Sequence, residues 1–180
     1  MIRHLTARIR AAVLLAGTAS LVACSTAPTY VRSVSQFVPP DFVAGGPTNL
    51  GDALRMLLDS FDHELVKTTA DQKGDWRPLV FLLTDGAPTD TEWRGYAEQL
   101  RARRPANIIA VACGDQADTN ALKQVTEIVI QMRDMSSDAF RAFFKFVSAS
   151  VKQTSAKVGA TAEGAGIQLP PPPPGITIVP

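Results

Sequence analysis

Three oxygen-bearing side chains stand at positions where a metal ion could be bound. Asp85 ends the apolar run in PLVFLLTDG, Asp115 follows the apolar segment NIIAVACG, and Thr48 lies in GGPTNL, just before an amphipathic stretch. Carboxylate and hydroxyl oxygens are the kind of ligand that Mg²⁺ prefers. Asp85 could therefore hold a metal. Alternatively, Asp85 and Gly86 form only the turn that ends a strand, with the aspartate bonding its own backbone.

Hydrophobic periodicity predicts the elements that position these residues. Apolar residues recur every three or four positions from Leu50 to Leu65, which indicates a helix with Thr48 or Asn49 as its cap. Segments 78–86 and 107–114 are apolar on both faces, as strands of a covered parallel sheet are. The sequence therefore places Asp85 and Asp115 at the ends of two buried strands.

The rest of the pattern continues the alternation of helix and strand. Helices are predicted over 90–104, 118–126 and 136–157, and a short strand over 127–132. Asp90 or Thr91 is placed to cap the first of these helices, and Ser136 or Ser137 to cap the last. The last helix carries a stripe that we assign to the core, made of Phe140, Phe143, Phe144 and Val147.

This order of elements predicts an α/β fold, with a doubly wound, mostly parallel sheet and helices on both faces. Such folds bind ligands beyond the carboxyl ends of their strands. Thr48, Asp85 and Asp115 are therefore expected at the same rim of the sheet.

Composition excludes several classes of function. The 180-residue chain has a formal net charge of +1, so we expect no nucleic-acid binding, which usually needs a basic face. Arg101, Arg103 and Arg104 are interpreted as the solvated end of a helix. Cys113 is interpreted as a small core residue. No nucleophile–base motif occurs, so no catalytic residue is predicted; a metal-assisted hydrolase that uses Asp85 and Asp115 is the enzymatic alternative.

The two ends differ from the middle in composition, which suggests three segments. Residues 1–30 look like a signal peptide or an unrelated stretch, with arginines before an apolar run and then LVAC, which resembles a lipobox with Cys24 as the lipidated residue. Residues 31–158 form the predicted domain. Residues 159–180 are rich in Ala, Gly and Pro and are predicted to be a disordered tail. We expect no strand of the domain before Val31.

The stretch GGPTNLGDAL, followed by PLVFLLTDGAPTD, resembles the central part of a von Willebrand factor A (VWA) domain. With LKQVTEIVIQM and AFFKFVSASV, the chain is similar to TerY-type proteins of bacterial tellurium-resistance clusters. The resemblance implies a Rossmann-like sheet with a metal-ion-dependent adhesion site. It also implies a non-enzymatic module, linked to tellurium resistance or stress response, that binds a protein partner through an acidic residue of that partner. Mg²⁺ is the implied ion, with Thr48 and Asp85 as ligands.

The chain departs from this family at the first metal-binding loop, where a D-x-S-x-S motif is expected and none occurs. The resemblance therefore implies an incomplete fold with a degenerate metal site. We expect a truncated, cytoplasmic member of the group. The alternatives are an envelope lipoprotein, which would contact the membrane only through a lipidated Cys24, and a gene remnant without function.

Overall fold

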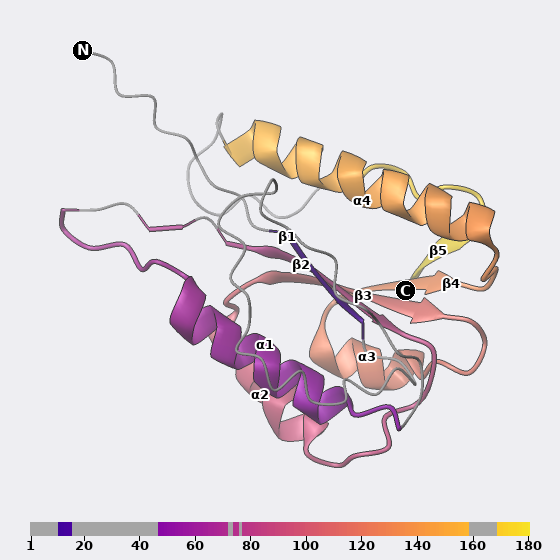
Figure 1. Cartoon of the computed structure of the whole chain (residues 1–180), viewed down its shortest axis with the longest axis horizontal. Coiled ribbons are helices and arrows are strands. Elements are labelled where there is room, and N and C mark those ends of the chain that lie inside the picture. The colour runs from indigo at the N-terminus through magenta and orange to yellow at the C-terminus, as the bar shows by residue number, and fades with distance from the viewer. Residues whose placement is uncertain (1–10, 16–46, 72–73, 76, 159–168) are drawn as a thin grey trace.

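The computed structural model of the chain describes residues 11–15, 47–71, 74–75, 77–158 and 169–180. Its elements alternate between strand and helix along the chain (Figure 1). They are β1 (Ala11–Leu15), α1 (Leu50–Glu64), β2 (Leu79–Thr84), α2 (Trp93–Arg103), β3 (Asn107–Cys113), α3 (Thr119–Val125), β4 (Ile128–Met132), α4 (Ser137–Val158) and β5 (Ile176–Val179). Each helix and strand predicted from periodicity is present, which confirms the α/β class.

Within the described part of the chain, the five strands form one sheet in the order β1-β2-β3-β4-β5. Strands β1 to β4 are parallel, and β5 is antiparallel to β4. In the register of the central strands, Leu79 lies between Ala11 of β1 and Asn107 of β3. The carboxyl ends of the parallel strands therefore share one rim, where β2, β3 and β4 are each followed by a helix.

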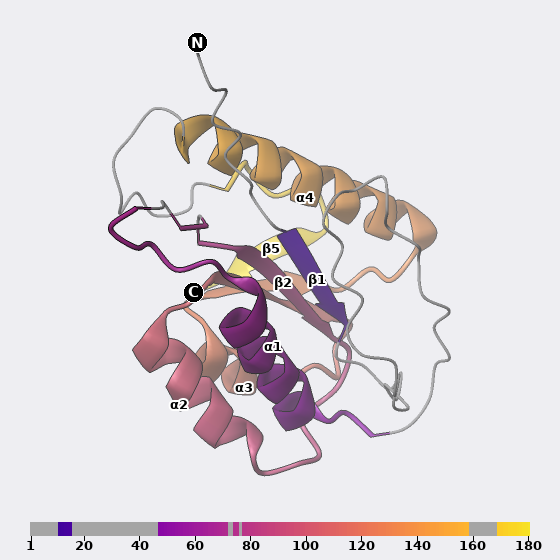
Figure 2. The ribbon, with the colours of Figure 1, turned by 60° about the vertical axis from the view of Figure 1, so that its left-hand side comes forward.

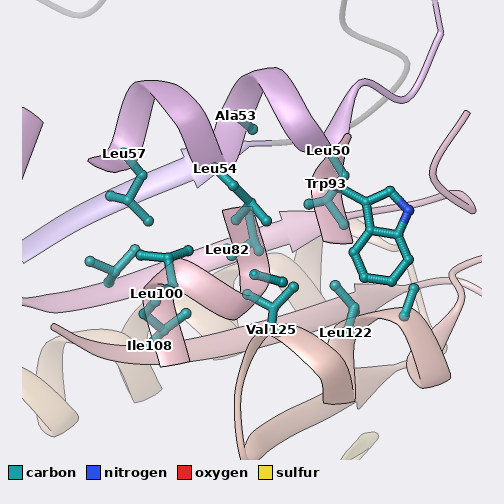
Figure 3. Packing of buried hydrophobic residues seen from close by; sticks show 14 of the residues in the cluster. Leu50, Ala53, Leu54, Leu57, Leu82, Trp93, Leu100, Ile108, Leu122 and Val125 are labelled. Carbon is teal, nitrogen blue, oxygen red and sulfur yellow. The ribbon is translucent and has the colours of Figure 1, made fainter. Parts of the chain in front are cut away.

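Helices cover both faces of the sheet (Figure 2). Val80 and Leu82 of β2 pack with α1, α2 and α3 in one apolar cluster, and Leu79, Phe81 and Leu83 pack with α4 in a second. This alternation follows from the two-residue period of a strand. Figure 3 shows the first cluster, in which Leu54 and Leu57 project from α1 toward the other side chains of the cluster. Both faces are buried, which explains why these strands read as continuous apolar runs.

Strand β1 corrects the expectation that no element of the sheet precedes Val31. Ala11–Leu15 lie in the apolar run that looked like the core of a signal peptide, and they pair with Leu79–Leu83 as a parallel strand. A short apolar run has the same sequence signature in a leader and in a buried strand, so periodicity could not separate the two. Cys24 and its lipobox lie outside the described residues.

Strand β5 corrects part of the predicted disordered tail. The proline run ends in a turn, in which Ile176 N–H donates to Pro173 O at 3.1 Å and Gly175 has a φ of 83°. Proline before glycine suits this turn, because the glycine takes a positive φ that other residues avoid. The β-branched residues that follow then pair with β4. The tail prediction therefore does not hold for residues 176–179, while residues 159–168 lie outside the described part.

The apolar stripe of α4 also differs from the prediction. Phe143 and Val147 are buried as expected, and Phe140 is partly buried against the same cluster. Phe144, however, leaves 47% of its surface exposed, and Phe146 takes its place in the core. The prediction that Phe144 packs in the core is therefore wrong.

Candidate functional site

The turn after β2 positions Asp85 at the rim of the sheet. Thr84, the last residue of the strand, is buried, whereas Asp85 is exposed. The Gly86 N–H donates to Thr84 Oγ1 at 3.4 Å, and the Thr84 hydroxyl lies 3.3 Å from Gly86 O. The side chain of Thr84 thus fixes the turn, and the carboxylate of Asp85 begins where the sheet meets solvent.

Thr48 lies directly against this turn. Its side chain is buried, with 5% of the residue exposed, and it precedes the first turn of α1. A Cβ added to Gly86 would lie only 2.9 Å from Thr48 Oγ1. The hydroxyl of Thr48 and the turn that carries Asp85 are therefore neighbours, as the chain order predicted. Glycine at position 86 is what allows this approach.

The loop after Asp85 is tied to the segment that contains Thr48. Thr89 N–H donates to Thr48 O at 3.0 Å, and the Thr89 hydroxyl donates to the same carbonyl at 3.1 Å. Two hydrogen bonds from one residue, Thr89, thereby hold the backbone of the Thr48 loop. This hydrogen bonding fixes the position of Thr48 relative to Asp85.

Asp90 caps helix α1 from the neighbouring loop, which the sequence did not predict. Gly51 N–H donates to Asp90 Oδ2 at 2.6 Å, while the N-cap residue Asn49 makes no capping bond with its side chain. Asn49 is thus the N-cap residue of α1 as predicted, but its side chain does not cap the helix. At α2 the predicted caps Asp90 and Thr91 were wrong, because that helix begins after Glu92 without a side-chain cap. A carboxylate near the first turn also suits the helix dipole. The capped residue is 39 positions away in the chain, and only a tertiary contact reveals such a pair.

Asp115 occupies a more open position at the end of β3. Its side chain is 80% exposed, and its carboxylate lies 3.9 Å from Arg133 Nε. The preceding residue, Gly114, has a φ of 80°, and its carbonyl accepts a hydrogen bond from Gln131 Nε2 at 2.7 Å. Asp115 is therefore a solvated carboxylate paired with a cation at the rim.

Comparison with known families agrees with this geometry. The family described as von Willebrand factor type A domain matches residues 14–156, which is more than half of the chain. The chain belongs to the VWA domain family. The match begins within β1, which supports that strand as part of the domain. No curated protein and no solved structure matches the chain.

The described part of this VWA domain fits a divalent metal only in part. Thr48 Oγ1 and the carboxylate of Asp85 offer oxygen ligands at the rim. Among the described residues, no group of three or more His, Cys, Asp or Glu side chains could hold a metal ion. Mg²⁺ requires near-octahedral oxygen coordination, and two protein ligands leave most of that shell to water. No described helix is long and apolar enough to cross a membrane.

The cap of α1 by Asp90 can be tested by unfolding. Asp90→Ala should lower the free energy of unfolding by about 1–2 kcal/mol, the usual cost of losing a side-chain cap. The loss is kept moderate because the other oxygen, Oδ1, is buried without a hydrogen-bond partner among the described residues. Urea denaturation followed by circular dichroism measures the change. Thr91→Ala is the matched control at the neighbouring exposed position, and equal effects of the two changes would contradict the cap.

The pKa of the Cys113 thiol depends in part on the charge of Asp85. The pKa of Cys113 is raised to about 11, chiefly by burial and then by the negative charge of Asp85, while a hydrogen bond from the Thr84 backbone lowers it. Because an unfolded thiol ionises near pH 8.5, the free energy of unfolding should fall as pH rises from about 8.5 to about 11. Cys113→Ala should remove this component of the pH dependence.

Asp85→Asn should lower the pKa of Cys113, since the like charge that opposes ionisation is removed. The ultraviolet absorbance of the thiolate, followed against pH in a Cys24→Ser background, measures this pKa. Asp115→Asn is the control, because Asp115 does not contribute to the shift of Cys113. An unchanged titration curve in Asp85→Asn would mean that the carboxylate does not lie near the thiol.

Proposed function

We propose that this VWA domain is a TerY-like, non-enzymatic protein-interaction module whose contact surface is the rim around Asp85. One observation carries the proposal: the hydroxyl of Thr48 lies against Gly86, beside the exposed Asp85, at the carboxyl end of β2. The two loops are joined by the hydrogen bond that Thr89 donates to Thr48 and the one that Asp90 accepts from Gly51. A preorganised rim of this kind suits binding, because little ordering of loops is needed when a partner docks.

We further propose that the metal site at this rim is degenerate. Leu15 ends β1, and the sequence continues Ala16-Gly17-Thr18-Ala19-Ser20. At the spacing of D-x-S-x-S, an alanine stands in the place of the aspartate, and hydroxyl residues stand in the places of the two serines. Residues 16–20 lie outside the described part, and their correspondence to the motif is one of sequence. A site without this carboxylate has lost one of its hard, charged ligands.

Calorimetry tests the degenerate site. The chain as it exists should bind Mg²⁺ weakly, with a dissociation constant above about 1 µM, because tighter binding needs several well-placed protein ligands. Ala16→Asp should strengthen binding by at least about tenfold if the register after β1 is correct. Asp85→Ala in the Ala16→Asp background should remove that gain. Submicromolar binding by the unchanged chain would contradict the proposal of a degenerate site.

Site-specific photocrosslinking tests the interaction surface. A photoreactive amino acid at Ala87, which is exposed two residues after Asp85, should crosslink a protein partner in cells of the source organism. The matched control is Ala102, which is also exposed but lies near the end of α2, where the chain leads to the amino end of β3 and not to the rim. Equal crosslinking from both positions, or none from Ala87, would contradict a partner site at the rim.

A further inference from the structure

The outward face of α4 combines one exposed aromatic ring with a series of cations. Arg141, Phe144, Lys145 and Lys152 all lie on it and are exposed. Together with Ser148 and Ala149 they line an open hollow of about 530 Å³. We refer to these six residues as the α4 outer face. Helix α4 itself covers the side of the sheet opposite α1 (Figure 1).

The charge on the α4 outer face has one sign. No Asp or Glu occurs between residues 139 and 154. The acid that precedes this stretch in the sequence, Asp138, accepts a hydrogen bond from Arg141 Nη1 at 2.6 Å. Among the described residues, no ion pair involves Lys145 or Lys152. These two cations lie seven residues apart, or about 10 Å along the helix, on one side of it.

Phe144 is held in place although it is exposed. Its ring lies 5.4 Å from that of Phe143, at an interplanar angle of 61°, and Phe143 is fully buried against the sheet. The helix is fixed by its inward residues Phe146 and Val147. An exposed aromatic ring that already packs against a buried neighbour is well suited to act as an anchor in an interface.

We propose that the α4 outer face is a docking surface for an acidic protein segment that carries an apolar anchor. The anchor would cover Phe144, and carboxylates of the segment would lie over Lys145 and Lys152. An amphipathic helix meets this requirement, because its residues i and i+7 share one face and are separated by about 10 Å, like the two lysines. The charge complementarity would orient the partner, and the aromatic contact would supply affinity.

A membrane surface fits these observations less well than an acidic segment. Polybasic recognition of anionic lipids typically involves four to eight cations, whereas this face has three and one of them is paired with Asp138. Interfacial helices also bury a broad apolar face in the lipid. The apolar face of α4 instead packs on the sheet, and among its described side chains Phe144 is the one large apolar group that remains exposed. We therefore assign the surface to a protein partner.

This surface is separate from the rim proposed above, so the two proposals fail independently. Fluorescence anisotropy of the full chain tests it with a labelled helical peptide of about 15 residues, composed of Leu, Ala and Glu with Glu at i and i+7. Phe144→Ala should weaken binding about fivefold or more, and Lys145→Glu or Lys152→Glu about tenfold, because the introduced charge repels the peptide. Binding should also weaken as ionic strength rises.

Met56→Ala is the matched control, because Met56 is 42% exposed on α1 and belongs to the other side of the molecule. It should leave binding unchanged. A peptide with Lys in place of every Glu should not bind. Circular dichroism verifies that each variant is folded. If a variant is unfolded, Lys152→Gln is used in its place, and it should also weaken binding of the acidic peptide.

Three results would overturn the proposal. The first is that the acidic peptide does not bind. The second is that the acidic and basic peptides bind equally well. The third is that the Phe144 and lysine variants bind the acidic peptide as tightly as the unchanged chain does. Vesicles of phosphatidylcholine and phosphatidylserine form a second arm of the experiment. Sedimentation of the chain with these vesicles, without binding of the peptide, would assign the α4 outer face to a membrane surface instead.

Discussion

Replacing Phe143 with alanine should lower the free energy of unfolding by about 3–5 kcal/mol, the usual cost of removing a buried phenylalanine side chain. Phe143 is fully buried between α4 and the sheet, and its ring lies 6.1 Å from Phe81 in an edge-to-face arrangement at 84°. The change removes apolar contacts and leaves a cavity that the surrounding strands cannot fill without moving. Urea denaturation measures the loss.

The adjacent residue provides the control for this prediction. Phe144→Ala should cost less than about 1 kcal/mol, because nearly half of the side chain is already exposed to water. Equal losses at the two positions would mean that α4 is rotated relative to the orientation described here. The same pair of variants thus tests which phenylalanine faces the sheet, and it verifies that Phe144 can be replaced without unfolding the domain.

This pair also shows how far periodicity can predict packing. The three-to-four-residue spacing of apolar side chains identified α4 and its buried face in general terms. Phe143 and Phe144 are adjacent on the helix, however, and both fit an apolar pattern with a spacing of three to four residues. Which of them is buried depends on how the helix is rotated against β2 and β3. That rotation is set by the shapes of the packed side chains, which a pattern of apolar and polar residues does not contain.

The edges of the sheet were less predictable than its centre. Strands β2 and β3 are buried on both faces and between two neighbours, so their sequences are long apolar runs. Strand β1 shares an apolar run with residues that resemble a leader peptide, and β5 follows a run of prolines. In each case the composition of the adjacent segment hid the pattern of the short strand, so the strand was not predicted. The pairing of these edge strands is decided by the sheet, which offers them free hydrogen-bonding groups.

The candidate site was predictable to the extent that it depends on chain order. The ends of parallel strands and the starts of the following helices meet at one rim, and this rule brought Thr48 to the turn of Asp85. The bonds that fix the rim were not predictable in the same way. Asp90 had a suitable position next to α2, yet it caps α1, because the loop after β2 folds back over the start of that helix. A local preference was overridden by a tertiary contact.

The cap of α1 by Asp90 makes Gly51 a residue at which a single added methyl group should have a large effect. Gly51→Ala should lower the free energy of unfolding by about 2–4 kcal/mol, the combined cost of overpacking and of losing the cap. An added Cβ would lie 2.1 Å from Asp90 Oδ2 and 3.0 Å from the backbone nitrogen of Trp93. The carboxylate must then leave its position at the Gly51 N–H, and the start of α2 must shift.

Gly95→Ala is the control for Gly51→Ala, because both glycines are helical and nothing lies within 4 Å of a Cβ added at Gly95. In an open helical position alanine is the better helix former, so Gly95→Ala should raise stability by about 0.5–1 kcal/mol. If the free energy of unfolding falls for Gly51→Ala and rises for Gly95→Ala, the loss at Gly51 is due to close contact and not to helix propensity. If Gly51→Ala were also stabilising, α1 and the loop of Asp90 would not meet as described. The rim would then lack the bond that holds the start of α1, next to Thr48, against the loop that follows Asp85.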